Sequence, residues 1–256
     1  MIDRRLAGTA AIALALLLGG CSATPSADSS PSAADGELTG EVTVFAAASL
    51  SPVFDEIAEA FTEEHPAVEV APIVYDGSSV LVTQLAEGAH ADVLATADER
   101  TMQTLVDTGL AAHSEPFATN TLVIATPAGN PAGVTSLADL AGATTVVCAP
   151  EVPCGAASKE LLDRAGVSIT PASLEQNVSA VLQKIVAGEA DAGLVYATDV
   201  AGEDVESVVP DGSDEVVNSY PIVALDGSTE AGRAFVEFVH GPVARQILAD
   251  HGFGAP

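Results

Sequence analysis

The sequence predicts an α/β fold, in which helices flank sheets of largely parallel strands. The first observation is that, from residue 41 onward, short apolar runs alternate with segments whose apolar residues recur every three or four positions. Such alternation is typical of parallel sheets with helical crossovers. The second observation is size, because 256 residues, of which 48% are hydrophobic, suffice for one large domain or two ordinary ones.

The first part of the alternating pattern precedes residue 121. We expect strands at residues 41–47, 68–74 and 91–96. We expect helices at residues 50–64, 78–88 and 97–109. Pro52 falls in the first turn of the first helix, where the missing N–H group is tolerated.

The second part of the pattern runs to the end of the chain. We expect strands at residues 121–127, 144–150, 191–197 and 220–226. We expect helices at residues 155–166, 177–188, 229–240 and 242–250. The helix that Asn177 opens has a predicted apolar face made of Val178, Val181, Leu182, Ile185 and Val186.

The N-terminus has the features of an export signal. Residues 1–20 combine two arginines, a short apolar run and small residues. They end in Leu18-Gly19-Gly20-Cys21, which resembles a bacterial lipoprotein cleavage box and implies lipidation of Cys21. Ordinary secretion with an incidental cysteine is the alternative. Residues 21–40 are rich in Ser, Ala, Pro and Asp, so they predict a flexible tether. We therefore expect an exported protein anchored by lipid to the outer face of the cytoplasmic membrane.

Charge and motifs exclude several functions. A formal charge of -28 argues against nucleic acid as a partner, because nucleic-acid binding requires a basic surface. The chain contains no G-x-S-x-G, no H-E-x-x-H and no phosphate-loop glycine pattern. We therefore expect a protein that is not an enzyme and carries no cofactor.

Two cysteines remain once Cys21 is set aside. Cys148 and Cys154 form an even pair in an exported chain, which favours a disulfide over two free thiols. Pro150 and Pro153 favour the turn that would close it. Two cysteines make a poor zinc site, because structural zinc takes four ligands.

Four predicted helices begin with small or polar residues. Ser49, Ser78, Gly155 and Asn177 lie at these starts, and Ser49 is expected to be an N-cap after a strand. The first turn of a helix has up to four N–H groups without a partner and carries a partial positive charge. Several such ends together would bind an anion without a cationic side chain. Taken singly, each of these residues is also an ordinary helix cap.

An ordered set of motifs resembles the substrate-binding proteins of bacterial molybdate importers. The motifs are VFAAASL at Val44–Leu50, GSS followed by QLAEGAHADV at Gln84–Val93, and then ADERTM, PEVPCG and GLVYATD. The resemblance implies a two-lobed type II periplasmic-binding-protein fold. In this fold each lobe is a mixed or parallel sheet flanked by helices, and the ligand lies in the cleft between the lobes. The lobes would be residues 41–120 plus 221–256, and residues 121–220.

The resemblance also implies a set of ligand-binding residues. These are the hydroxyls of Ser49, Ser78 and Tyr196, and the backbone N–H groups of Cys154 and Val178. Ser79 adjoins Ser78, and Tyr196 is alternatively a half-buried core residue at a strand end. All five are neutral donors, which suits molybdate because the dianion only accepts hydrogen bonds. Asp76 is an acidic residue that flanks this anion site in the sequence. The sequence does not explain its presence there, unless its side chain points outward.

The resemblance implies capture of molybdate, and of the nearly isosteric tungstate, for delivery to the membrane permease of an ABC importer. The only metal expected is the one inside the oxyanion. We expect a monomer that meets the membrane through lipidated Cys21. One alternative is a binding protein for another tetrahedral oxyanion, such as sulfate or phosphate. A lipoprotein that acts as a scaffold or adhesin is a further alternative.

Overall fold

The computed structural model describes residues 37–256. The predicted signal peptide, Cys21 and residues 21–36 of the predicted tether lie outside the described residues. Within residues 37–256, no helix is both long enough and apolar enough to cross a membrane.

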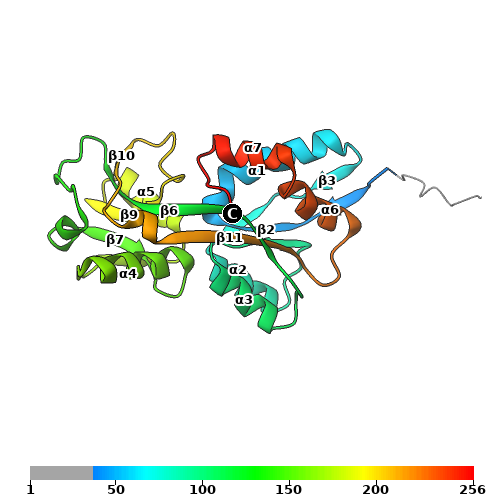
Figure 1. The fold of residues 1–256 in the computed structure, drawn as a ribbon, viewed down its shortest axis with the longest axis horizontal. Coiled ribbons are helices and arrows are strands. Elements are labelled where there is room, and N and C mark those ends of the chain that lie inside the picture. Colours follow the sequence, from blue (N-terminus) through cyan, green and yellow to red (C-terminus); the bar gives the residue numbers. More distant parts are fainter. Residues whose placement is uncertain (1–36) are drawn as a thin grey trace, which may run out of the picture. The chain divides into compact units, whose positions relative to one another are not determined.

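The described part confirms the predicted α/β fold class (Figure 1). Strands form a nine-stranded sheet in the order β4-β2-β5-β11-β6-β9-β7-β8, with β10 paired to β6. These strands are β2 (Val44–Ala47), β4 (Val74–Asp76), β5 (Val93–Ala95), β6 (Glu115–Pro127), β7 (Thr145–Cys148), β8 (Ser173–Glu175), β9 (Ala192–Tyr196), β10 (Val205–Val208) and β11 (Val217–Ala224). A separate parallel pair is formed by β1 (Gly40–Val42) and β3 (Val68–Val70).

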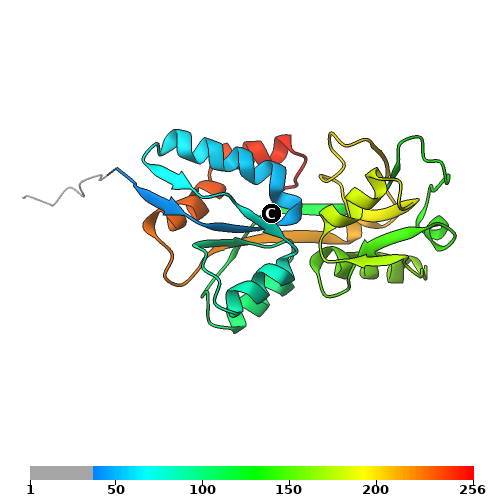
Figure 2. The same ribbon diagram turned by 180° about the vertical axis from the view of Figure 1, so that it is seen from behind.

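Helices flank these sheets on both sides (Figures 1 and 2). The α-helices are α1 (Ser51–Glu64), α2 (Ser78–Ala86), α3 (Glu99–Asp107), α4 (Pro153–Ala165), α5 (Val178–Val186), α6 (Glu230–Val239) and α7 (Pro242–Asp250). Three short 3-10 turns are η1 (Ala48–Leu50), η2 (Leu137–Ala141) and η3 (Ser213–Glu215).

Two antiparallel strands, β6 and β11, connect two halves of the described part (Figures 1 and 2). The first half contains β1–β5 with α1–α3, α6 and α7; the second half contains β7–β10 with α4 and α5. β11 pairs with β5 of the first half, and β6 pairs with β9 of the second half. Within the halves, β2 is parallel to β4 and β5, and β7 is parallel to β8 and β9. The sheet is therefore mixed, with antiparallel strands only where the halves join and at β10.

An aromatic cluster holds the helices of the first half together. The apolar face of α1 is buried, and its Phe54 and Phe61 pack against Phe235 of α6. Phe117 of β6 packs against Phe54 with ring centroids 5.6 Å apart. Burial of such large apolar side chains is the main favourable term in folding.

Several predicted boundaries were wrong. The apolar runs at 41–47 and 68–74 each divide into two strands, because β1 and β3 pair in a sheet of their own. The helix expected at 155–166 begins two residues earlier, because Pro153 suits the first helical position. Val186 is 45% exposed and does not belong to the apolar face of α5. The short strands β8 and β10 were not predicted, since each carries too few residues for a periodic pattern.

The predicted disulfide between Cys148 and Cys154 is confirmed, and the free-thiol alternative is wrong. The two Cα atoms lie 5.7 Å apart. The bond connects the end of β7 to the first turn of α4. It therefore fixes the N-terminus of α4 against the sheet.

Candidate functional site

A small cavity lies where the strand ends of both halves meet the starts of α2, α4 and α5. Its empty space is about 220 Å³, part of which is open to solvent. The lining residues are Ala47, Ala48, Ser49, Asp76, Gly77, Ser78, Ala97, Val152, Pro153, Cys154, Asn177, Val178 and Tyr196. The structure thus brings together all five residues of the predicted ligand set, from segments far apart in the sequence.

Ser49 lines this cavity but is not the N-cap that we expected. It lies inside η1, while α1 begins at Ser51 with Leu50 as its N-cap. Residues 48–50 form a 3-10 turn instead, in which the N–H of Ser51 donates to the carbonyl of Ala48. The Ser49 side chain is buried, and its Oγ lies 3.1 Å from the hydroxyl of Tyr220 on β11.

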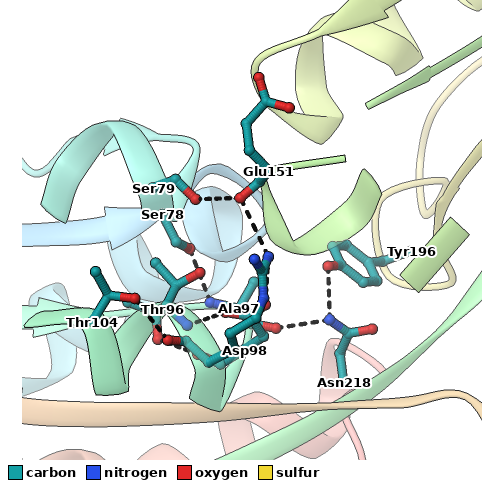
Figure 3. A network of polar contacts seen from close by, with 11 residues as sticks. Ser78, Ser79, Thr96, Ala97, Asp98, Thr104, Glu151, Tyr196 and Asn218 are labelled. Atoms are coloured by element: carbon teal, nitrogen blue, oxygen red, sulfur yellow. Dashed lines mark hydrogen bonds and ion pairs between the residues drawn. The ribbon is translucent and has the colours of Figure 1, made fainter. Parts of the chain in front are cut away.

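Ser78 is the first residue of α2 and is almost completely buried. Its Oγ accepts a hydrogen bond from the backbone N–H of Ala97 at 3.0 Å (Figure 3). The oxygen is therefore engaged as an acceptor, and the hydroxyl hydrogen remains free to be donated. The neighbouring Ser79 is not part of the cavity lining, and its hydroxyl donates to the carbonyl of Glu151 at 2.8 Å.

Cys154 and Val178 contribute backbone N–H groups from the first turns of α4 and α5. The first N–H groups of a helix have no partner within the helix. Among residues 37–256, no hydrogen bond uses the N–H of Cys154 or of Val178. The Asn177 side chain caps α5 as predicted, by accepting from the N–H of Ala180 at 2.9 Å. Both N–H groups can therefore bind an acceptor in the cavity.

Gly155, which was expected to open a helix, is the third residue of α4. A Cβ at this position would lie 1.9 Å from the carbonyl oxygen of Ala149. Glycine therefore permits close packing of α4 on the end of β7, next to the disulfide. Gly155 itself is not part of the cavity lining.

Tyr196 ends β9 and is both a core residue and part of the cavity wall. Its hydroxyl accepts a hydrogen bond from Nδ2 of Asn218 at 3.0 Å (Figure 3). Burial, followed by the nearby Tyr220, raises the pKa of the Tyr196 hydroxyl well above its usual value. The hydroxyl is therefore protonated at neutral pH and can donate.

Asp76 does not point outward but lines the cavity. Its Oδ1 accepts from the N–H of Gly77 at 2.7 Å and from Nδ2 of Asn177 at 2.9 Å. The second bond joins residues 101 positions apart, so no local pattern could have indicated it. This acidic residue is thus a structural link between the two halves.

The cavity is built for a species that accepts hydrogen bonds. Its lining contains no Lys, Arg or His. Among residues 37–256, no group of three or more His, Cys, Asp or Glu side chains could hold a metal ion. Apart from the Asp76 carboxylate, which accepts from Gly77 and Asn177, the available groups are hydroxyls, N–H groups and the positive ends of α2, α4 and α5, which together favour an anion.

Three residues that support the site were not predicted from the sequence. Ala97, Asn218 and Tyr220 each form hydrogen bonds to a hydroxyl of the predicted ligand set. Asn218 and Tyr220 are two residues apart on β11 and therefore face the same side of the sheet. No local pattern could have revealed them, because their partners are distant in sequence.

Fold and site together define a solute-binding protein, whose donor-lined cavity lies between two halves joined by two strands. A family model described as bacterial extracellular solute-binding protein matches residues 42–254. The chain belongs to this family. The expectation of a binding protein rather than an enzyme is thereby confirmed.

Relatives refine this assignment. The molybdate-binding protein ModA of Mycobacterium tuberculosis (strain ATCC 25618 / H37Rv) is 43% identical over 222 residues, which cover 84% of this chain and 85% of that protein. ModA of Escherichia coli (strain K12) is 31% identical over 236 residues, covering 84% and 89%. These matches confirm the resemblance indicated by the motifs.

Solved structures share the fold. The periplasmic molybdate-binding protein of Azotobacter vinelandii aligns with a TM-score of 0.69 at 19% identity, over 84% of this chain and 99% of that one. The sulfate-binding protein SubI of Mycobacterium tuberculosis H37Rv aligns with a TM-score of 0.66 at 21% identity, over 83% and 86%. At these identities the structures support the fold alone.

Proposed function

We propose that this protein captures molybdate, and also tungstate, outside the cytoplasm and delivers it to the permease of an ABC importer. The observation that carries the proposal is the convergence of five neutral donors, from Ser49, Ser78, Cys154, Val178 and Tyr196, on one cavity. The 43% identity to a molybdate-binding protein supports the choice of ion.

The chemistry of the cavity suits a fully deprotonated dianion. Three hydroxyls and two backbone N–H groups offer hydrogen bonds, and hydrogen bonds to charged groups stabilise by roughly 1.5–3 kcal/mol each. The helix ends add fixed partial charge without a counter-ion. A strongly acidic chain gives an anion no long-range attraction, so binding relies on short-range dipoles in a low-dielectric site.

Closure of two lobes around the ion is part of the proposal. Residues 41–120 plus 221–256 would supply Ser49 and Ser78, while residues 121–220 would supply Cys154, Val178 and Tyr196. Only a closed arrangement allows both lobes to contact the ion, so the ligand favours closure. The strands β6 and β11 would act as the hinge.

We further propose that the mature chain begins at a lipidated Cys21 and acts as a monomer tethered to the membrane by residues 21–40. The composition of that segment supports this, because it offers little to bury. In cell fractionation, Cys21→Ser should move the protein from the membrane to the soluble fraction.

The ligand is tested by the thermal midpoint of the purified protein with molybdate, tungstate, sulfate and phosphate in turn. At about 100 times the dissociation constant, a ligand adds roughly 2.7 kcal/mol of stability. For a domain of this size the midpoint should rise by roughly 5–10 °C. The double variant Ser49→Ala, Tyr196→Phe is the matched control and should lose most of the rise.

Each outcome has a distinct meaning. A rise with molybdate and tungstate alone supports the proposal. A rise with sulfate or phosphate alone keeps the binding role and changes the ligand, an alternative that neutral donors also allow. No rise with any oxyanion contradicts capture and favours a scaffold role.

A further inference from the structure

We propose that Asn218, which does not itself line the cavity, is a positioning residue that directs the Tyr196 hydroxyl hydrogen toward the bound oxyanion. The inference rests on the proposed function and deepens it. It concerns the polarity of the hydrogen bonds around the site, which decides whether a hydroxyl offers its hydrogen or its lone pair to the ligand.

Asn218 makes two hydrogen bonds through one nitrogen atom. Its side chain is buried, and Nδ2 donates to the carbonyl oxygen of Ala97 at 2.9 Å and to the Tyr196 hydroxyl at 3.0 Å (Figure 3). A carbonyl oxygen only accepts, so the amide atom facing Ala97 must be the nitrogen. Its two hydrogens then have one partner each, and the Tyr196 oxygen accepts.

This bond decides what Tyr196 can do for a ligand. A phenol has one hydrogen, and an oxygen that accepts from Asn218 keeps that hydrogen for another partner. Tyr196 lines the cavity, and a deprotonated dianion there provides acceptors only. Without Asn218 the hydroxyl would have to find its orientation when the ligand arrives. Preorganised donors bind better because this ordering is already complete.

Ala97 extends the same arrangement to Ser78. The N–H of Ala97 donates to Ser78 Oγ at 3.0 Å, while its carbonyl accepts from Asn218. A single peptide segment after β5 is thus linked to one hydroxyl from each half. In both Ser78 and Tyr196 the oxygen is engaged by a protein donor, which leaves both hydrogens for the ligand.

The strand that carries Asn218 strengthens the inference. β11 passes through both halves, and Tyr220, two residues further on, lies 3.1 Å from Ser49 Oγ. The hinge strand therefore contacts ligand hydroxyls from the first half and from the second. If Asn218 served only as packing, its amide would not have to donate both to the Ala97 carbonyl and to the Tyr196 hydroxyl.

A double-mutant cycle tests the positioning role. Molybdate affinity is measured by titration calorimetry for wild type, Tyr196→Phe, Asn218→Leu and the double variant. We expect each single change to weaken binding by roughly tenfold or more, the range for losing or misdirecting a hydrogen bond to a charged group. The double variant should bind no more weakly than Tyr196→Phe alone, because Asn218 acts through the hydroxyl that this variant lacks.

Two further variants separate positioning from packing. Asn218→Ala leaves a space in the core, whereas Asn218→Leu fills it. If Asn218 only packs, the two variants should differ in molybdate affinity. If Asn218 positions the Tyr196 hydroxyl, both variants should lose affinity to a similar extent. Thr145→Val removes another buried hydrogen bond, from Oγ1 to the carbonyl of Leu140 at 2.8 Å, away from the cavity. This control should lower the thermal midpoint of the ligand-free protein without changing affinity.

The results that would overturn the inference are distinct from failure of the proposed function. Additive losses in the double variant, or unchanged affinity in both Asn218 variants, would contradict the positioning role alone. Wild-type protein that binds none of the four oxyanions would contradict the proposed function and this inference together.

Discussion

Asp76 and Asn177 are joined by a hydrogen bond of 2.9 Å between Oδ1 and Nδ2 at the edge of the cavity. Asp76 ends β4 in the first half, and Asn177 caps α5 in the second. The bond therefore fastens the halves together beside the site. It also places a carboxylate in the wall of a cavity that we propose receives a dianion.

Replacing this carboxylate with an amide should tighten molybdate binding. In Asp76→Asn, an amide oxygen can still accept from Asn177, while the negative charge is lost. Repulsion between a carboxylate and a dianion that share one small cavity is on the order of a few kcal/mol at an effective dielectric constant of about 20. Titration calorimetry at low and at high salt should show that Asp76→Asn binds molybdate at least about threefold more tightly than wild type does. Asp76→Ala should gain less, because it also loses the bond. Weaker binding by Asp76→Asn would contradict a repulsive role.

A methyl group at Gly77 should hinder closure. A Cβ there would lie 2.1 Å from the carbonyl oxygen of Gln176 in the second half. The Gly77 backbone, with φ of -59° and ψ of 132°, suits any residue, so Gly77→Ala should leave the ligand-free fold intact. We expect molybdate affinity to fall by more than about tenfold, the equivalent of 1.4 kcal/mol.

The matched control for Gly77 is Gly142→Ala, whose Cβ would have the carbonyl oxygen of Asp139 as its nearest neighbour, at 3.7 Å. Its affinity for molybdate should match wild type. Small-angle scattering with and without molybdate would show compaction in wild type and in the control, but not in Gly77→Ala. Equal compaction in all three proteins would argue against a closing motion at this contact.

Loss of the Ser49 hydroxyl should weaken binding without unfolding the protein. Ser49→Ala removes one donor to a charged ligand, which costs roughly 1.5–3 kcal/mol of binding free energy. Ser51→Ala, two residues away and outside the cavity lining, is the control. Equilibrium titration should show a loss for the first variant only, and wild-type affinity in Ser49→Ala would mean that the site is wrongly placed.

Reduction of the disulfide should destabilise the protein. Cys148 and Cys154 close a short loop, for which the chain-entropy model gives roughly 2 kcal/mol. The thermal midpoint should fall by roughly 4–8 °C in reductant. The double variant Cys148→Ala, Cys154→Ala should start at the lower midpoint and show no response to reductant. A wild-type midpoint that reductant leaves unchanged would show that the bond adds no stability.

Asp199 should make stability depend on pH. Burial raises the pKa of its carboxyl from 3.8 to about 7, although the hydrogen bond from the Tyr196 backbone N–H lowers it. Between these two values the folded state binds more protons than the unfolded state, so the free energy of unfolding falls as pH rises from about 4 to about 7. The total loss is at most about 4 kcal/mol, and less where solvent reaches the half-buried group.

Urea unfolding across this pH range measures the effect. Asp199→Asn should remove most of the slope and be more stable than wild type above pH 7, since an amide stays neutral. A variant with the same pH profile as wild type would show that other groups govern it.

Local patterns predicted most single elements. The helix at 242–250 was placed at its observed bounds, because Pro242 suits a first turn and apolar residues recur at helical spacing. Asn177 was correctly placed as the cap of α5, because an asparagine side chain can accept from a free N–H group of the first turn. The order of strands was not predicted, because β11 enters between β5 and β6 through pairing between distant segments.

The amino-acid sequence alone indicated the α/β class, the export signature, the cysteine pair and the ligand positions implied by the motifs. These depend on spacing within short segments. Tertiary structure alone decided that Asp76 faces the cavity, that Ser49 precedes the helix it was expected to cap, and that Asn218 and Tyr220 support the hydroxyls. Ser49 and Tyr220 are 171 residues apart, and such a contact depends on how the whole sheet assembles rather than on local hydrogen bonding.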